Sequence, residues 1–311
     1  MMVDVVIPTY KPNEKLLKML DALCTQTVEV NKIVLMNTEQ KYIENLFRGR
    51  KYEKNLKRVE VRNVSAWEFD HGKTRNDGSK GSVADFILYM TQDAAPYDDT
   101  LIEQLLKAFD DPLVASAYAR QIPHDDATYA EQFSRSFNYP DQSIVKSAAD
   151  IENMGIKAFF CSNACAMYRR EIFEQLGKFP TKMIFNEDMV FAHKVLMQGY
   201  KIAYVADALV VHSHNYTNKQ QFHRNFDLAV SQAMHPEVFE GVSSESEGKS
   251  YAKAALSYFK SIKKPYLFIP FGITCAYRLA GFKLGKRYNK MSHRKILKYT
   301  MSPMFFKKLW S

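Results

Sequence analysis

The stretch Val3-Asp4-Val5-Val6-Ile7-Pro8-Thr9-Tyr10 opens the chain with a run of aliphatic residues that stops at a proline. A second run, Phe86-Ile87-Leu88-Tyr89-Met90, has the same character and is followed by Thr91-Gln92-Asp93-Ala94. Near-continuous apolar strands are typical of parallel sheets that are covered by helices on both faces. Because strand-like and helix-like stretches alternate between and after these two runs, the sequence predicts an α/β fold with a mostly parallel sheet.

The first part of the chain divides into short predicted elements. The strands are expected at 3–9, 32–37, 59–64 and 86–92, and the helices at 13–26 and from Lys73 onward. In open sheets of this kind, ligands bind beyond the carboxyl ends of the strands. Three polar segments fall there, namely Pro8-Thr9-Tyr10, Asn37-Thr38-Glu39 and Gln92-Asp93-Ala94. The sequence therefore predicts a ligand site at this edge of the sheet.

The second half of the chain places two adjacent carboxylates, Glu187 and Asp188, at the head of a predicted helix that runs to Gln198. A helix N-terminus favours negative charge, so such acids stay ionised more readily. Further on, His212 and His214 lie two apart in a strand-like run and should share one face. Residues 119–153 show no clear period, and we expect a binding loop or lid there.

The net charge of +9 is unevenly distributed along the 311 residues. From Lys249 to Ser311 there are 15 Lys and Arg and no acid, whereas the preceding residues hold 28 basic and 34 acidic side chains. A basic tail on an acidic body indicates that one end meets an anionic surface. The four cysteines show no zinc-site spacing, and no leader precedes the first strand, so we expect reduced thiols and a cytoplasmic location.

The tail contains an apolar run, Tyr266 to Tyr277, bracketed by basic residues. The run is shorter than the ~20 residues of a spanning helix, so we expect it to lie on a membrane surface rather than cross it. A tail helix packed on its own body or on a second subunit is the alternative. No nucleic-acid-binding motif accompanies the charge. The polar stretch 241–248 resembles a hinge, which predicts one domain at 1–240 and a basic, helical region at 249–311.

Five stretches, in this order, carry a resemblance to a known family. They are residues 5–10, Phe69-Asp70-His71-Gly72-Lys73-Thr74-Arg75-Asn76, Thr91-Gln92-Asp93-Ala94, residues 161–170 and Asn186-Glu187-Asp188. The chain resembles the inverting nucleotide-sugar glycosyltransferases of family 2, which have the GT-A fold, and is most similar to bacterial rhamnosyltransferases of cell-surface polysaccharide synthesis. The resemblance covers roughly residues 3 to 216.

The resemblance implies a binding site for a nucleotide-diphosphate sugar. Its expected residues are Pro8, Thr9, Tyr10, Asn37, Glu39, Lys73, Arg75, Asn76, Gln92 and Asp93. Two positions depart from the family. An Asp commonly follows the second strand there, whereas this chain has Asn37-Thr38-Glu39, and Thr91-Gln92-Asp93 keeps only the last acid of the Asp-x-Asp metal motif.

The resemblance also assigns the chemistry. Asp93 and His212 would hold a divalent cation, Mn²⁺ or Mg²⁺, on the donor diphosphate. Asp188 would be the general base that takes the acceptor's proton, and Glu187 would orient either the acceptor or Asp188. Ser162 and Asn163 would contact the acceptor.

The expected reaction is transfer of L-rhamnose from dTDP-β-L-rhamnose to a lipid-linked precursor of a cell-wall or surface polysaccharide. The enzyme would be cytoplasmic and peripheral at the inner face of the cell membrane. Two alternatives stay open at this point: the same chemistry with a UDP-hexose or UDP-galactofuranose donor, and a non-catalytic scaffold of the same fold. Whether the tail binds a membrane or another copy in a homo-oligomer is also open.

Overall fold

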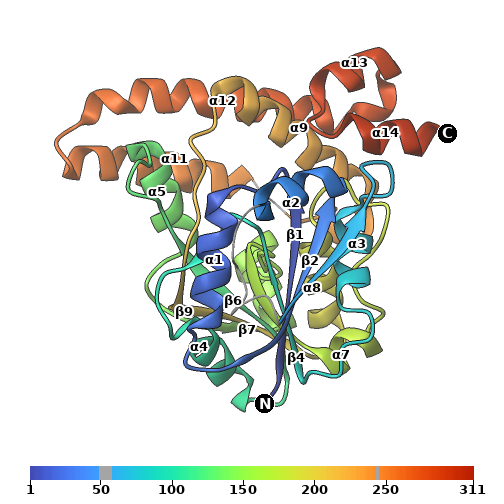
Figure 1. The fold of residues 1–311 in the computed structure, drawn as a ribbon. Coiled ribbons are helices and arrows are strands. Elements are labelled where there is room, and N and C mark those ends of the chain that lie inside the picture. The colour runs from blue at the N-terminus through green and yellow to red at the C-terminus, as the bar shows by residue number, and fades with distance from the viewer. Residues whose placement is uncertain (49–57, 243–244) are drawn as a thin grey trace.

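The computed structural model describes residues 1–48, 58–242 and 245–311. Over these residues, nine strands form one mixed sheet in the order β3-β2-β1-β4-β8-β6-β9-β5, with β7 beside β9 (Figure 1). The strands are β1 (Val3–Tyr10), β2 (Val30–Thr38), β3 (Val59–Val64), β4 (Phe86–Met90), β5 (Ala95–Pro96), β6 (Val114–Ile122), β7 (Ile144–Lys146), β8 (Cys165–Arg169) and β9 (Lys201–Val211).

Helices cover both faces of the sheet and extend beyond its edge (Figure 1). They are α1 (Glu14–Cys24), α2 (Gln40–Phe47), α3 (His71–Gly78), α4 (Leu101–Lys107), α5 (Tyr129–Asn138), α6 (Ile151–Met154), α7 (Arg170–Gln175), α8 (Glu187–Met197), α9 (Asn218–Met234), α10 (Pro236–Phe239), α11 (Glu245–Ser261), α12 (Phe268–Gly285), α13 (His293–Tyr299) and α14 (Pro303–Trp310).

The first four strands are parallel, as the sequence predicts: β1 lies between β2 and β4, and β2 pairs with β3. Strand alternation divides the core between two faces. Val5 and Ile7 pack with Leu16 and Leu20 of α1, whereas Val6 joins the aromatic cluster on the opposite face beneath α7 and α8. The predicted elements of this half agree with the observed bounds within two residues. The fold class is therefore confirmed.

Helix α3 begins at His71, two residues before the predicted start. Asp70 is the cap, because its Oδ1 accepts a hydrogen bond from the backbone N–H of Lys73 at 2.8 Å. Gly72 permits a close approach, since a Cβ at this position would lie 1.8 Å from the carbonyl oxygen of Pro180. The loop before α8 therefore packs directly on the first turn of α3.

The expectation of an irregular segment at 119–153 is wrong. Strand β6 continues to Ile122, and α5 and β7 follow it. Helix α5 is stabilised by Thr128, whose side chain accepts from the N–H of Glu131, and by the ion pair of Glu131 with Arg135 one turn later. The helix also carries a hydrophobic period, because Tyr129, Phe133 and Phe137 recur at intervals of four residues and share one face. Strand β9 runs from Lys201 to Val211 and ends one residue before His212.

The C-terminal helices pack on the body of the protein. Cβ atoms on Gly281 and Gly285 would lie 2.2 Å and 2.3 Å from the carbonyl oxygens of Phe222 and Phe226, so α12 lies directly against α9 (Figure 1). Residues 243 and 244 of the predicted hinge lie outside the described residues. Gly241 lies in a turn, and α11 begins at Glu245, so residues 245–248 of that stretch are helical.

The expected length of the apolar tail segment is also wrong. Residues 265–285 form a helical stretch of 21 residues that is long and apolar enough to cross a membrane, judged by length and composition alone. The apolar run in the sequence stops before Arg278, but the helix continues to Gly285.

Candidate active site

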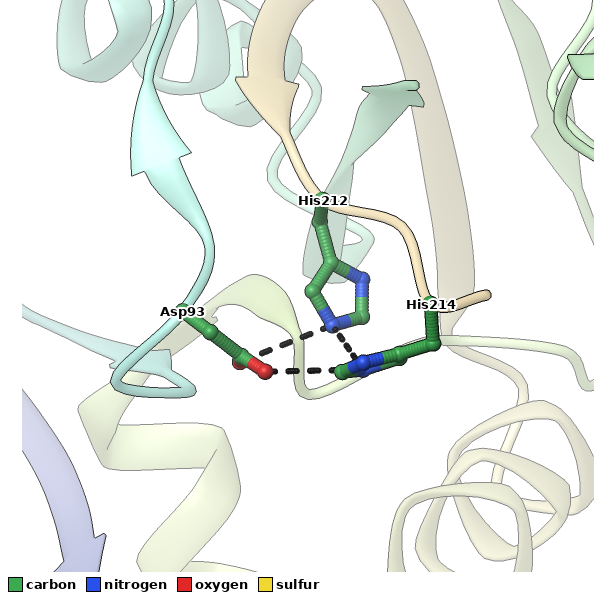
Figure 2. A group of neighbouring side chains, drawn as sticks. All are labelled: Asp93, His212 and His214. Carbon is green, nitrogen blue, oxygen red and sulfur yellow. Dashed lines mark hydrogen bonds and ion pairs between the residues drawn. The ribbon is translucent and has the colours of Figure 1, made fainter. Parts of the chain in front are cut away.

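Three potential metal ligands meet beyond the ends of two strands. Asp93 follows β4, and His212 and His214 follow β9; their side chains point toward one another (Figure 2). His212 Nε2 lies 3.6 Å from Asp93 Oδ1, and His214 Nε2 lies 3.4 Å from Asp93 Oδ2. The two Nε2 atoms are 3.1 Å apart. One carboxylate oxygen and two imidazole nitrogens are a donor set that fits a divalent cation.

Gln121 on β6 sets the tautomer of His212. Its Nε2 donates to Ser162 Oγ at 3.0 Å, so its Oε1 is the acceptor that faces His212 Nδ1 at 2.7 Å. The proton of His212 therefore lies on Nδ1, and the lone pair of Nε2 faces Asp93. Burial lowers the pKa of His212 to about 3, which keeps the imidazole neutral and able to bind a cation.

Asp188 lies in the first turn of α8, where it is partly buried. Asn186 precedes the pair of acids with φ of 63°, a left-handed conformation that Asn tolerates, and this turn starts the helix at Glu187. Asp188 Oδ2 accepts from the backbone N–H of Asn163 at 3.1 Å. The expectation that both acids stay ionised at the helix N-terminus is wrong for Asp188, because burial and the neighbouring charge of Glu187 raise its pKa to about 7. A carboxylate of this kind can take up a proton near neutral pH.

Glu187 points away from solvent, into the protein. Its Oε1 lies 3.0 Å from Arg75 Nη1 and accepts from Asn163 Nδ2 at 3.3 Å. Tyr168 in turn donates its hydroxyl to Asn163 Oδ1 at 2.8 Å. Arg75, which the resemblance assigns to the nucleotide sugar, is thus buried against Glu187. These contacts link α3, the loop before β8 and the start of α8 around Asp188.

Several residues predicted at the nucleotide sugar hold the backbone in place. Gln92 forms two hydrogen bonds with the backbone of Tyr10, at 2.9 Å and 3.0 Å, which join the ends of β4 and β1. Thr9 donates to Asn37 Oδ1 at 3.3 Å, and Asn37 donates to Asn63 Oδ1 at 2.7 Å. The buried Thr9 and Asn37 therefore have partners within the protein.

The other predicted residues at this edge differ in exposure. Tyr10 is 50% exposed. Its ring contacts that of Tyr42 edge-on at 5.6 Å, and Lys11 Nζ lies 5.2 Å from the ring centroid. Pro8 is half-buried, and Glu39 Oε1 accepts from the N–H of Ala66 at 2.7 Å.

Two predicted residues on α3 have partners of their own. Lys73 is exposed and pairs with Asp77 one turn later. The Asn76 amide bonds both backbone groups of Phe179, at 2.9 Å and 3.1 Å, which fixes the loop before α8 to α3.

The sequence did not point to Arg224, Gln121 or Arg135 as parts of the site. The Arg224 guanidinium on α9 lies over the rings of Phe185 at 4.6 Å and Tyr216 at 5.8 Å, and within the described residues it forms no ion pair. Tyr216 stacks on His214 at 4.8 Å, and the Arg224 charge is, after burial, one of the lesser factors that lower the pKa of His212 and His214, so Arg224 lies near the Asp93–His212–His214 cluster. Arg135 pairs with Glu131 at 2.7 Å and donates to Gln121.

Comparison with known proteins identifies the family of the chain. The model of "Glycosyl transferase family 2" matches residues 4–177. The chain is 38% identical over 301 residues to the O-antigen chain rhamnosyltransferase RfbN of Salmonella typhimurium, covering 94% of this chain and 91% of that protein. It is 40% identical over 233 residues to the O-antigen chain rhamnosyltransferase WbaN of Salmonella anatum, covering 73% of each.

Solved structures show the same fold at low sequence identity. The mannosyltransferase PcManGT from Pyrobaculum calidifontis, in complex with GDP-Man and Mn²⁺, has a TM-score of 0.61 and 16% identity over 93% of this chain and 88% of that one. TarS 1–349 of S. aureus, in complex with UDP-GlcNAc, has a TM-score of 0.53 and 13% identity over 93% and 92%. The GT-A fold predicted from the sequence is confirmed. The chain belongs to glycosyl transferase family 2 and is a glycosyltransferase.

Proposed function

We propose that this chain transfers L-rhamnose from dTDP-β-L-rhamnose to a lipid-linked precursor of a bacterial surface polysaccharide, with inversion at C1. The observation that carries the reaction class is Asp188, a carboxylate with a pKa of about 7 whose position is fixed by the N–H of Asn163. The sugar and the polymer are supported by the two relatives named as O-antigen chain rhamnosyltransferases.

Asp188 acts as the general base in this proposal. The acceptor hydroxyl oxygen forms a bond to C1 of rhamnose on the face opposite the diphosphate, while the bond from C1 to the diphosphate oxygen breaks. The hydroxyl proton passes to the Asp188 carboxylate. A base with a pKa near the working pH is best matched to this transfer, which contributes roughly 100- to 10,000-fold to the rate.

The Asp93–His212–His214 cluster would hold Mn²⁺ or Mg²⁺ at the leaving diphosphate. When bound, the cation stabilises the negative charge that develops on the leaving oxygen. Gln121 keeps the lone pair of His212 Nε2 directed at the site, and Arg224 supplies a further positive charge on the same side. The exposed ring of Tyr10 is suited to stack on the thymine base.

Helix α12 would bring the enzyme to the membrane that carries its acceptor. Apolar side chains are exposed along its outer face at Ile269, Ile273, Tyr277 and Leu284, and Tyr266 is exposed just before the helix. Basic residues flank this face, and the last 63 residues, Lys249 to Ser311, contain no acid to oppose binding to anionic lipid. Because Gly281 and Gly285 keep α12 against α9, we favour a helix that lies on the membrane over one that crosses it.

The test is a transfer assay with Mn²⁺ or Mg²⁺, comparing dTDP-rhamnose with several UDP-hexoses and UDP-galactofuranose on a lipid-linked saccharide. Transfer of rhamnose alone, lost in Asp188→Asn, supports the proposal. Transfer from a uridine donor would leave the proposed mechanism standing and show that the donor sugar is not rhamnose. A folded wild-type protein that binds no nucleotide sugar by calorimetry would contradict catalysis and favour the scaffold.

A further inference from the structure

A cavity of about 450 Å³ adjoins the candidate active site. It lies between α5, the segment after β9, α9, α11 and α12, and it is of the size that bound small molecules occupy in proteins. His214, one of the three potential metal ligands, forms part of its wall, and Phe271, Thr274 and Arg278 of α12 form another part. The cavity therefore connects the Asp93–His212–His214 cluster with the helix whose outer face is apolar.

The charged groups of the cavity favour an anion. The Arg278 Nε donates to Gln221 Oε1 at 3.0 Å and its Nη1 donates to the Tyr251 hydroxyl at 3.3 Å, so the guanidinium is held by neutral groups. Within the described residues, Arg278 has no ion pair, and Glu131, the acid among the lining residues, is paired with Arg135. An arginine held in this way is well placed to bind a phosphate group.

The remaining walls are largely aromatic and apolar. Tyr129, Tyr251 and Phe271 line the cavity, together with Thr128, Asn215 and Thr274, whose side chains are hydrogen-bonded within the protein. Ring faces beside a few polar groups suit the mixed apolar and hydroxyl surface of a sugar. Phosphate and sugar chemistry thus occur together in one cavity next to α12.

One helix serves both the cavity and the outer surface. Phe271, Thr274 and Arg278 follow one another at intervals of three and four residues and so share the inner face of α12. Ile269 and Ile273 lie on the opposite face, where they are 70% and 49% exposed. A molecule whose apolar part lies in a membrane against the outer face could place its polar end in the cavity.

We propose that this cavity is the acceptor subsite and that it binds the phosphate-linked sugar end of a short lipid-linked saccharide, with Arg278 on the phosphate. The inference rests on the proposed function, which supplies the lipid-linked acceptor. The hydrogen-bond path from Glu131 through Arg135 and Gln121 to Ser162 connects the cavity wall with the loop that holds Asp188. With its phosphate bound to Arg278, the saccharide would extend toward Asp188. The distance between Arg278 and Asp188 would then determine which sugar hydroxyl reacts.

The experiment measures binding and transfer with two water-soluble acceptors, a short saccharide with a phosphate at its reducing end and the same saccharide without it. Arg278→Gln is compared with Arg287→Gln, an exposed arginine just beyond the same helix. We expect Arg278→Gln to weaken calorimetric binding of the phosphorylated saccharide tenfold or more, and to leave the unphosphorylated saccharide, donor KM and donor hydrolysis unchanged. Arg287→Gln should resemble the wild type throughout.

Thr274→Leu fills the cavity without altering charge, and it carries the test if Arg278→Gln does not fold. It should weaken binding of both saccharides and spare donor hydrolysis. Equal binding by Arg278→Gln and Arg287→Gln, together with no effect of Thr274→Leu, would overturn the subsite. Because binding is measured without a donor, its loss in Arg278→Gln supports the subsite even if dTDP-rhamnose proves not to be the substrate.

Discussion

Arg75 and Glu187 form an ion pair at 3.0 Å in which both side chains are only 6% exposed. The pair joins α3 to the start of α8 and places a buried negative charge one residue before Asp188. Replacing only one partner of such a pair typically costs about 3–5 kcal/mol of stability, because the other charge stays buried and unpaired. The ion pair therefore contributes to the fold and to the protonation of the proposed base.

Glu187→Gln should lower the pKa of Asp188, because it removes a like charge and leaves Arg75 unopposed beside it. Wild-type kcat/KM should rise with pH through about 7 as Asp188 loses its proton. In the variant this acidic limb should move to lower pH, while the melting temperature falls. Profiles of pH against rate for both enzymes provide the measurement. Glu174→Gln, an exposed acid on α7, is the control, and an unmoved limb in Glu187→Gln would contradict the assignment.

Asp188→Asn should lower the transfer rate and raise the stability of the protein above neutral pH. The folded-state pKa of Asp188, about 7, lies above its ordinary value of 3.8, so the stability that this group contributes is full below pH 4 and is lost as the pH rises through 7. The Asn side chain does not ionise, so above pH 7 it avoids the cost of burying a charged carboxylate. The variant should therefore melt higher than the wild type at pH 8 but not at pH 4, and its transfer rate should fall roughly 100- to 10,000-fold. Equal transfer rates in a folded variant would remove Asp188 as the base.

The cation site should depend on a residue that does not bind the cation itself. Gln121→Ala removes the acceptor that holds His212 Nδ1–H, and loss of such a partner typically weakens metal affinity about 10- to 100-fold. Asp93→Asn and His212→Ala should weaken it further. Mn²⁺ titration by calorimetry measures these affinities, with His235→Ala, a histidine paired with Glu237, as the control. Full affinity in all three site variants would place the cation elsewhere.

Arg224→Gln should raise the KM of the donor and spare the acceptor. Its guanidinium lies over the rings of Phe185 and Tyr216 and forms no ion pair within the described part of the chain, so we expect it to be available to the donor diphosphate. Calorimetry with the nucleoside diphosphate should show weaker binding by about tenfold or more, whereas the nucleoside alone should bind as before. Arg294→Gln, an exposed arginine, provides the matched control. Equal losses for nucleoside and diphosphate would point to a packing role instead.

The strands and the two acids were predictable because their signals are local. Val3–Tyr10 and Phe86–Met90 are apolar on both faces, and the start of α8 is marked by Asn186 and the acids after it. The pairing of Arg75 with Glu187 was not predictable, since 112 positions separate the two residues and only the packing of α3 on the loop before α8 brings them together.

The length of α12 was missed for a different reason. The apolar run in the sequence ends before Arg278. In the structure, Arg278 lies on the inner face of the helix, one turn beyond Thr274, so it does not interrupt the outer apolar face. Helix α5 was missed although Tyr129, Phe133 and Phe137 share one of its faces, because it is short and lies between irregular segments. In both cases the face on which a side chain lies decides the structure, and a linear count does not record it.

The outer face of α12 should be required for binding to anionic membranes. Ile269→Asp combined with Ile273→Asp places two acids on a face that is 70% and 49% exposed at these positions, so folding should be retained while contact with lipid becomes unfavourable. Sedimentation with vesicles that contain anionic lipid should pellet the wild type and leave the variant in solution. Val83→Asp, at an apolar residue that is 75% exposed before β4, should pellet like the wild type. High salt should weaken wild-type binding, because the basic tail supplies part of the attraction. If the wild type instead stays in solution as a dimer that the double variant dissociates, a second copy of the chain covers this face and the membrane proposal is wrong.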